Sequence, residues 1–457
     1  MNNPKFEEFS KVSAKEWKQK IQVDLKGADY NNTLIWHSNE GIDVKPFYDV
    51  EDLNPEHQLD IPKANQWRIC QSIYVSDLEI SNKKALEYLE KGATSIKFTI
   101  PNNDTDLNKL FLNLNLSEVE IHIQPLFLSL EFALSLDKFA KESNGQIYLH
   151  SDCIGHLSKS GNWFHNFKDD LKNTVEILKS CHNLKSNLSI NLELFQNAGA
   201  NMVQQLAYSI AQGFEYINAF GEEIKTTITF NVSVGSNYFF EIAKLKALRL
   251  LWHSIASDAK LANTNCHILA TPSKRNKTLY DYNTNMLRTT TECMSAILGG
   301  ANTVSNLPYD FVYHKTNDFA ERITRNQLLI LKHESYFDKV SNPTDGSYYI
   351  ESLTHQLAEK ALGLFKDIET QGGYLKLLKE GIIQKKIKES ADQELQQFED
   401  GKEILLGTNI HPNPEDKMKD DIQLYPFLKM NPRKTLLQPI LEKRLAERME
   451  QNRLNDE

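Results

Sequence analysis

The middle of this 457-residue chain alternates short apolar runs with longer amphipathic stretches, from Trp67 to about His333. Such alternation is typical of α/β folds in which crossover helices join parallel strands. About eight runs predict strands, and they are Arg68–Val75, Thr94–Ile100, Val119–Ile123, Gln146–Ser151, Asn187–Glu193, Thr226–Val234, Cys266–Thr271 and Ala301–Ser305. Eight strand–helix units in succession favour a closed (β/α)8 barrel, the TIM-barrel fold, over an open sheet.

The segments on either side of the predicted barrel have different patterns. A short helix is predicted around Ala14–Leu25, and an extended, proline-bearing approach to the barrel follows it. After the barrel, an apolar helix face ends at Gly372-Gly373, because glycine takes the backbone conformation that closes a helix. Residues 431–457 have a helical charge pattern with no evident partner in their own chain. We therefore expect an N-terminal arm, a barrel, a helical extension and a charged tail, at residues 1–66, 67–338, 339–400 and 401–457.

Bulk properties argue against several classes of protein. A formal charge of -9 and a pI of about 5.9 disfavour a general nucleic-acid binder, which needs a clustered basic face. No apolar run approaches the ~20 residues that span a bilayer, so we expect no membrane insertion. The cysteines never form a Cys-x-x-Cys word and are Cys70, Cys153, Cys181, Cys266 and Cys293. This spacing favours reduced structural thiols in the cytoplasm over a disulfide framework or a zinc site.

Four blocks of the sequence resemble the methylmalonyl-CoA mutase family. They are Glu40–Tyr48, Asn285–Glu292 with Gly299–Ala301, Arg322–Gln327 and Pro343–Glu351, and they occur in the same order in that family. The resemblance extends from about Trp17 to Tyr374, and several words in order are far more specific than a single motif. It implies a radical isomerase that converts methylmalonyl-CoA into succinyl-CoA with adenosylcobalamin.

The chain departs from this family at residues that the chemistry requires. Catalytic relatives place a histidine at the end of the fifth barrel strand, where it hydrogen-bonds the thioester carbonyl. The family motif that follows this histidine is retained here as Gln196–Ala200. The position that matches the histidine is Leu194, whose side chain cannot donate a hydrogen bond. No arginine occurs between Arg68 and Arg249, although the substrate carboxylate and the phosphates of CoA call for arginines.

Two further family features are absent from the sequence. Pro62–Gln66 stands where catalytic chains carry a tyrosine-bearing loop. The chain also has no Asp-x-His-x-x-Gly word, whose histidine ligates cobalt in the family. Arg433-Lys434 and Pro439–Glu442 resemble the segment before the linker to the cobalamin domain, and we expect that domain to be missing.

These departures together resemble the small, or beta, subunit of heterodimeric methylmalonyl-CoA mutases, and the loop Asp152–His156 does so as well. The resemblance implies a non-catalytic chain that stabilises a large, or alpha, subunit, which carries the adenosylcobalamin. On this hypothesis the chain has no catalytic, cofactor-binding or metal-ligating residue of its own. Its partner is the large subunit, rather than nucleic acid or a membrane.

Two alternatives stay open at this point. His150, Asp152 and His156 lie at the end of the fourth strand, where barrel active sites occur. They predict either an independent barrel enzyme, with a metal or catalytic role, or ordinary loop hydrogen bonds. A stand-alone acyl-CoA-binding protein is the other alternative. Arg322 and Arg325 predict a phosphate contact or, more commonly, salt bridges at the barrel or an interface.

Overall fold

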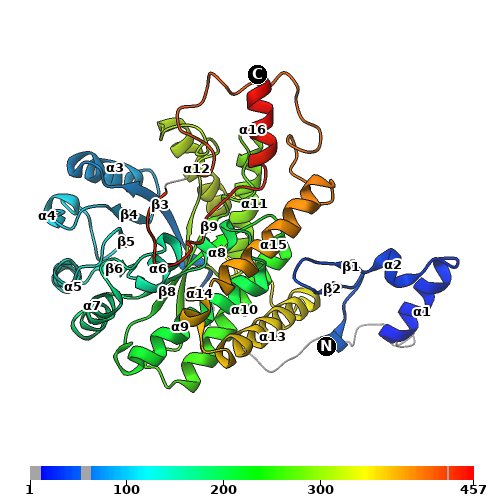
Figure 1. Ribbon diagram of the computed structural model, residues 1–457, viewed down its shortest axis with the longest axis horizontal. Coiled ribbons are helices and arrows are strands. Elements are labelled where there is room, and N and C mark those ends of the chain that lie inside the picture. The colour runs from blue at the N-terminus through cyan, green and yellow to red at the C-terminus, as the bar shows by residue number, and fades with distance from the viewer. Residues whose placement is uncertain (1–11, 53–62, 430–431) are drawn as a thin grey trace, which may run out of the picture.

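The computed structural model describes residues 12–52, 63–429 and 432–457, and its centre is an eight-stranded parallel sheet (Figure 1). Its strands are β3 (Arg68–Tyr74), β4 (Ser95–Ile100), β5 (Glu120–Pro125), β6 (Gln146–Leu149), β7 (Ser189–Asn191), β8 (Ile228–Val234), β9 (Cys266–Pro272) and β10 (Thr303–Ser305). Each strand overlaps one of the predicted apolar runs. The prediction of a (β/α)8 barrel is therefore confirmed.

The barrel closes between β6 and β7. Along the sheet the strand order is β6-β5-β4-β3-β10-β9-β8-β7, with parallel neighbours throughout. At the seam, the Lys185 N–H donates to the Ile147 carbonyl at 2.9 Å, and the Leu149 N–H donates to the Ser186 carbonyl at 2.8 Å. These bonds join the residues before β7 to β6 and complete the circle.

Helices follow the strands and cover the outside of the barrel (Figure 1). The longer ones are α3 (Leu78–Glu90), α5 (Leu130–Ser143), α7 (Phe167–Ser180), α9 (Met202–Phe220), α10 (Tyr238–Asp258), α11 (Thr284–Leu298) and α12 (Asp318–His333). Shorter helical segments are α4 (Leu107–Leu110), α6 (Cys153–Ser160), α8 (Glu193–Asn197) and the 3-10 turns η2 (Ala64–Gln66) and η3 (Gly221–Glu223). The apolar core lies between these helices and the strands and inside the barrel.

Local sequence explains both ends and the buried face of these helices, and α5 is an example. The Ser129 hydroxyl accepts a hydrogen bond from the Phe132 N–H, which satisfies an amide of the first turn. Phe132, Leu136 and Ala140 recur at a spacing of four residues and are buried against the barrel. Asn144 ends the helix in the left-handed conformation, with φ 50°.

After the barrel, three helices form an additional layer. They are α13 (Tyr348–Thr370), α14 (Tyr374–Lys379) and α15 (Ile382–Glu399), and α13 packs on α9 and α10. Leu357, Ala361 and Ile368 lie on the buried face of α13. Gly372 and Gly373 follow the helix with φ of 109° and 90°, so the predicted glycine stop is confirmed.

The tail packs on its own barrel, which differs from the expectation of no partner within the chain. Helix α16 (Glu447–Asp456) carries Glu450, which accepts a hydrogen bond from the Leu279 N–H at 2.7 Å and lies 2.6 Å from Arg444. The guanidinium of Arg453 lies 3.9 Å from the ring centre of Tyr280. The expectation was wrong because these partners are a backbone amide and an aromatic face, which a pattern of charges does not reveal.

The N-terminal arm projects sideways from the barrel (Figure 1). It contains α1 (Ala14–Asp24), as predicted, then α2 (Tyr30–Leu34), a hairpin of β1 (Trp36–His37) and β2 (Asp43–Val44), and the 3-10 turn η1 (Val50–Asp52). No residue of α1 is buried. The remaining parts of the predicted arm, residues 1–11 and 53–62, lie outside the described residues. Within the described part of the chain, none of the helices has both the length and the apolar character to cross a membrane.

Candidate functional site

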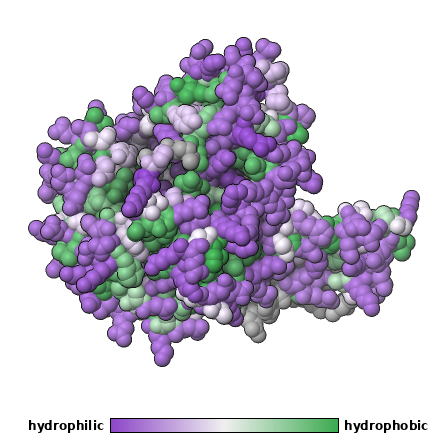
Figure 2. Space-filling model, viewed as in Figure 1, coloured by the Kyte–Doolittle hydropathy of each residue, from purple (hydrophilic) through white to green (hydrophobic). Residues whose placement is uncertain are grey.

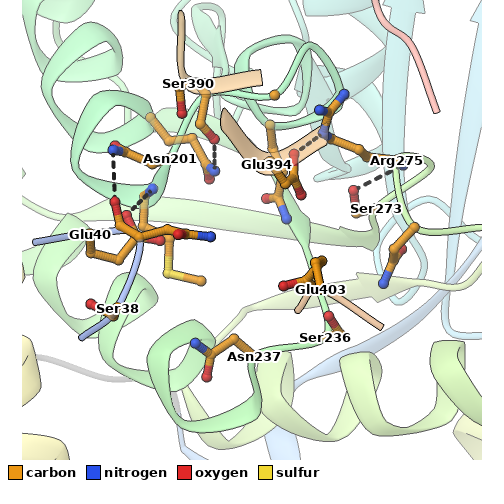
Figure 3. A pocket seen from close by; sticks show the side chains of 18 of the residues that line it. Ser38, Glu40, Asn201, Ser236, Asn237, Ser273, Arg275, Ser390, Glu394 and Glu403 are labelled. Carbon is orange, nitrogen blue, oxygen red and sulfur yellow. Dashed lines mark hydrogen bonds and ion pairs between the residues drawn. The ribbon is translucent and has the colours of Figure 1, made fainter. Parts of the chain in front are cut away.

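The C-terminal end of the barrel, here called the mouth, contains a polar cavity of about 170 Å³ (Figure 3). In (β/α)8 enzymes this end of the barrel carries the active site. The cavity lies among the loops that follow β7, β8 and β9, which contribute Gln196, Ser236 and Arg275. The arm adds Glu40, and α15 adds Glu394, so segments from both ends of the chain help to enclose it.

Glu40 joins the arm to the barrel at one end of the cavity. Its Oε2 accepts a hydrogen bond from the Met202 N–H, at the start of α9, at 2.7 Å. Removal from water raises the pKa of Glu40 to about 7, although the amides at the start of α9 favour its charged form. The carboxyl therefore changes its charge near neutral pH.

A buried ion pair lies beside the cavity, and its carboxylate, that of Glu241, is part of the cavity lining. Lys244 Nζ lies 2.6 Å from Glu241 Oε2, and neither side chain is exposed. Lys244 also donates to Gln196 Oε1 at 2.8 Å and to the Ser233 carbonyl at 2.8 Å. Burial lowers the pKa of Lys244, and the Glu241 carboxylate opposes this effect. Because its protons have partners, Lys244 holds the loop after β7 in place rather than offering a free amine.

The opposite end of the cavity carries its arginine (Figure 3). Arg275 Nε lies 2.5 Å from Glu394 Oε2 of α15, and Arg275 Nη1 donates to the Lys443 carbonyl at 2.8 Å. Burial and the nearby Glu394 raise the pKa of Glu403, which also lines the cavity. With its guanidinium already paired and several carboxylates around it, the cavity disfavours an anionic ligand.

A segment from the tail crosses the mouth. This segment, residues 436–445, is called the strap below. The Leu437 and Ile440 amides donate to the carbonyls of Gly161 and Ser158. Further along, the Lys443 amide donates to the Asn197 carbonyl at 2.9 Å. The strap thus spans from the loop after α6 to the loop after β7.

Leu194 lies at the beginning of this polar region but takes no part in it. It belongs to α8, directly after β7, and is 1% exposed in the apolar core. The following word, Gln196–Ala200, forms a tight turn in which Gly199 has φ +97°. A Cβ at Gly199 would lie 2.5 Å from Ala391 of α15, so only glycine permits this close approach.

The structure separates the three residues of the alternative site. His150 lies inside the barrel, where its Nε2 is 2.9 Å from His122 Nδ1. Asp152 caps α6 and accepts hydrogen bonds from the Gly155 amide and the Tyr216 hydroxyl, each at 2.7 Å. His156 stacks on Phe164, with ring centres 3.6 Å apart. Each side chain has a structural partner of its own, and the three do not converge.

The two arginines of α12 contact aromatic rings. Arg322 lies over Phe319 at 5.5 Å, and Arg325 lies over Tyr88 at 5.9 Å, each measured to the ring centre. Arg325 is buried against the barrel wall. Both contacts are with aromatic rings rather than with the carboxylates of the predicted salt bridges, and they place the two arginines against helices of the barrel.

Comparison with known proteins identifies the family. A family model described as methylmalonyl-CoA mutase matches residues 102–453. The chain is 36% identical, over 92% of its own length and 73% of the relative's, to a methylmalonyl-CoA mutase small subunit of Porphyromonas gingivalis. This chain belongs to the methylmalonyl-CoA mutase family. A methylmalonyl-CoA mutase of Rhizobium meliloti is 27% identical over 91% of this chain, and a small subunit from Streptomyces virginiae is 26% identical over 89%. The chain spans 66% and 71% of the lengths of these two relatives.

The words that carry the family resemblance stabilise the barrel wall. Gln327 of α12 donates to the Met286 carbonyl and the Thr290 hydroxyl of α11, at 2.6 and 2.7 Å. Glu292 pairs with Lys277 at 2.8 Å, and neither side chain is exposed. These contacts tie the sequence blocks that resemble the family into the packing of the barrel wall.

Sequence reasoning singled out Gln196–Ala200 and, as part of a family block, Glu40, but not the other polar groups of the mouth. Glu241 and Lys244 stand at a spacing of three in the otherwise apolar pattern of α10, and charged residues in a helix that is apolar on all sides indicate a buried pair. That signal was available. No sequence pattern reveals the role of Glu40, because its partner on α9 is more than a hundred residues away along the chain.

Proposed function

We propose that this chain is the non-catalytic small subunit of a heterodimeric methylmalonyl-CoA mutase, in which the large subunit converts methylmalonyl-CoA into succinyl-CoA. The observation that carries the proposal is Leu194, an apolar, buried side chain at the position of the family histidine. Without that donor the thioester carbonyl has no proton-bearing neighbour from this position. The acidic cavity and the paired Arg275 support the same conclusion, since both disfavour the carboxylate and phosphates of the substrate.

The residues at the mouth do not fit adenosylcobalamin. In the family the cobalt-ligating histidine belongs to the Asp-x-His-x-x-Gly motif, which this sequence lacks, and none of the described residues that line the mouth cavity is a histidine that could replace it. The strap is bonded across the same end of the barrel. We therefore assign the cofactor to the large subunit and derive no step through it on this chain.

The arm is the region that we assign to the large subunit. Trp17 and Val23 of α1 are 50% and 72% exposed, and the arm extends away from the barrel with apolar side chains on its surface (Figure 2). Exposed apolar side chains on a projecting segment are typical of a protein interface. We expect the heterodimer interface to be well above the ~2,000 Å² of standard complexes.

The remaining alternatives have less support. An independent enzyme at His150 and His156 requires side chains that converge, and these two diverge. A stand-alone acyl-CoA-binding protein requires cations for the phosphates, and the mouth cavity is acidic. A cytoplasmic location agrees with five free, buried cysteines and stays part of the proposal.

Co-purification with the large subunit tests the proposal. The chain alone, after incubation with adenosylcobalamin and gel filtration, should retain no corrinoid absorbance and should not convert methylmalonyl-CoA. Leu194→His should remain inactive as well, because catalytic groups that act as a unit are not restored singly. Mixing with the large subunit should give a stable complex with turnover. Stoichiometric corrinoid on the lone chain, or turnover by it, would overturn the proposal.

Deleting residues 1–60 tests the role of the arm. The truncated chain should keep the circular dichroism of a folded barrel but fail to capture the large subunit in a pull-down. Capture with unchanged affinity would reassign the arm to packing on its own barrel.

A further inference from the structure

The base of the barrel, opposite the mouth, contains a polar cluster that has no role in the proposed function. Glu120 and His122 lie on β5, His267 lies on β9 and Thr303 lies on β10, each within the first three residues of its strand. His122 is fully buried, while Glu120 and His267 are 7% and 5% exposed. The cluster therefore lies inside the barrel and reaches solvent at its base.

The ligand-type atoms of this cluster converge. One atom each from Glu120, His122 and His267 lies within 4.8 Å of the others. Glu120 Oε1 is 2.8 Å from His122 Nε2 and 3.9 Å from His267 Nε2. Around a tetrahedral Zn²⁺ with bonds of about 2.0–2.1 Å, ligand atoms are about 3.3 Å apart. The two measured separations bracket that value, so small side-chain rotations would place the atoms around one ion.

A second layer of hydrogen bonds orients His122. Its Nδ1 lies 2.9 Å from His150 Nε2, and His150 Nδ1 lies 3.0 Å from the side-chain amide of Asn231. Asn231 Oδ1 is buried without a hydrogen-bond partner. In the orientation that the structure shows, Asn231 Nδ2 donates to His150 Nδ1. Turning the amide by 180° places Oδ1 there instead, so that His150 Nδ1 donates to Asn231 and His150 Nε2 accepts the proton of His122 Nδ1.

This direction of the hydrogen bonds has a consequence for His122 Nε2. The nitrogen then presents a lone pair to Glu120 Oε1, and the contact is repulsive unless a cation lies between them. Metal-ligating histidines characteristically donate their other N–H to such an outer partner. The layer of His150 and Asn231 is therefore suited to hold His122 as a ligand.

We propose that Glu120, His122 and His267 bind a divalent transition-metal cation, best represented by Zn²⁺. Two imidazoles and one carboxylate suit Zn²⁺, whereas Ca²⁺ and Mg²⁺ prefer oxygen ligands throughout. Thr303 lies beside these ligands, because its Oγ1 donates to Glu120 Oε1 and lies 3.1 Å from His267 Nε2. The proposal differs from the expectation of no metal ligand, because ligands on separate strands match no spacing template in the sequence.

The ion would stabilise the barrel as a cross-link between two of its strands. It links β5 to β9 across the interior and binds the folded chain in preference to the unfolded one, so it raises stability by mass action. This role does not depend on a partner subunit or on any catalysis. The inference therefore stands or falls separately from the proposed function.

Metal titration of the full chain tests the site. After treatment with EDTA and dialysis, the protein should take up one equivalent of Zn²⁺, measured by mass spectrometry of the bound metal, and its melting temperature should rise. Glu120→Gln and His267→Gln should each weaken binding on the order of 100-fold, and His150→Gln should weaken it by roughly 10- to 100-fold through the outer layer. His253→Gln, which changes an exposed histidine of α10, should bind as tightly as the wild type.

The Co²⁺ complex of the unmodified chain provides a second measurement. Four-coordinate Co²⁺ gives intense visible absorption, which should appear at one equivalent and disappear when Zn²⁺ is added. It decides the question even where a cluster variant fails to fold. No uptake above the dialysis background, equal binding by all variants, or only the pale spectrum of six-coordinate Co²⁺ would overturn the proposal.

Discussion

The two ends of this barrel satisfy their polar side chains in different ways. At the mouth, the Met202 amide at the start of α9 donates a hydrogen bond to Glu40 of the arm. Arg275 forms an ion pair with Glu394 of α15 and donates a hydrogen bond to the Lys443 carbonyl of the strap.

At the base, Glu120 contacts His122 of its own strand, His267 of β9 and Thr303 of β10. The mouth is therefore covered by segments added to the barrel, whereas the base is part of the barrel wall. A site at the mouth can lose its chemistry while the strands that form the base stay unchanged.

Breaking the buried ion pair at the mouth should give the largest effect. Glu241→Ala leaves the Lys244 ammonium buried without its carboxylate, and we expect a loss of about 3–5 kcal/mol in the free energy of unfolding, measured with urea. The double variant Glu241→Leu with Lys244→Met should lose clearly less, because no charge stays unpaired. A single-variant loss below about 1 kcal/mol would mean that water reaches this pair.

The turn after Leu194 should respond more moderately. Gly199→Ala forces a side chain into a left-handed conformation and against Ala391, so we expect a loss of about 1–3 kcal/mol in urea unfolding. Gly363→Ala in α13 is the matched control, since a Cβ there meets nothing within 4 Å and alanine is the better helix former. Equal changes in the free energy of unfolding for the two variants would show that α15 does not pack closely against the turn at Gly199.

The contact between arm and barrel should depend on pH. The pKa of Glu40 is raised from 4.5 to about 7, so its contribution to stability is complete below pH 4.5 and is lost as the pH rises through 7. Glu40→Gln keeps an acceptor for the Met202 amide without ionising. Because one pKa unit corresponds to about 1.4 kcal/mol, we expect the variant to be more stable than the wild type by about 2–3 kcal/mol at pH 8 and similar to it at pH 4.5. If Glu40→Gln were more stable than the wild type only at low pH, the pKa of Glu40 would be shifted in the opposite direction on folding.

A surface ion pair beside the mouth should have the smallest effect. Arg448 lies 2.6 Å from Glu399, but its side chain is 64% exposed. Arg448→Ala should change the free energy of unfolding by less than about 0.5 kcal/mol, and added salt should remove the difference. A loss comparable to that of Glu241→Ala would place the start of helix α16 among the parts that support the mouth.

Short-range patterns were sufficient for most of the fold. The eight strands, helix α1 and the glycine stop after α13 were predictable because each depends on residues that are neighbours in sequence. The barrel itself followed from the order of these units, since βα units in succession have few ways to pack. The proposed match of Leu194 to the family histidine rests on the neighbouring Gln196–Ala200 motif, which is also a pattern of adjacent residues.

The sequence by itself determined the family, the barrel and the leucine at the fifth strand, because these depend on local periodicity and on words of adjacent residues. Only the tertiary structure decided that the strap crosses the mouth, that Glu40 joins the arm to α9, and that Glu120, His122 and His267 converge. The physical reason is distance along the chain. A closed barrel brings the ends of all its strands together, and no pattern of neighbouring residues states which distant side chains will meet there.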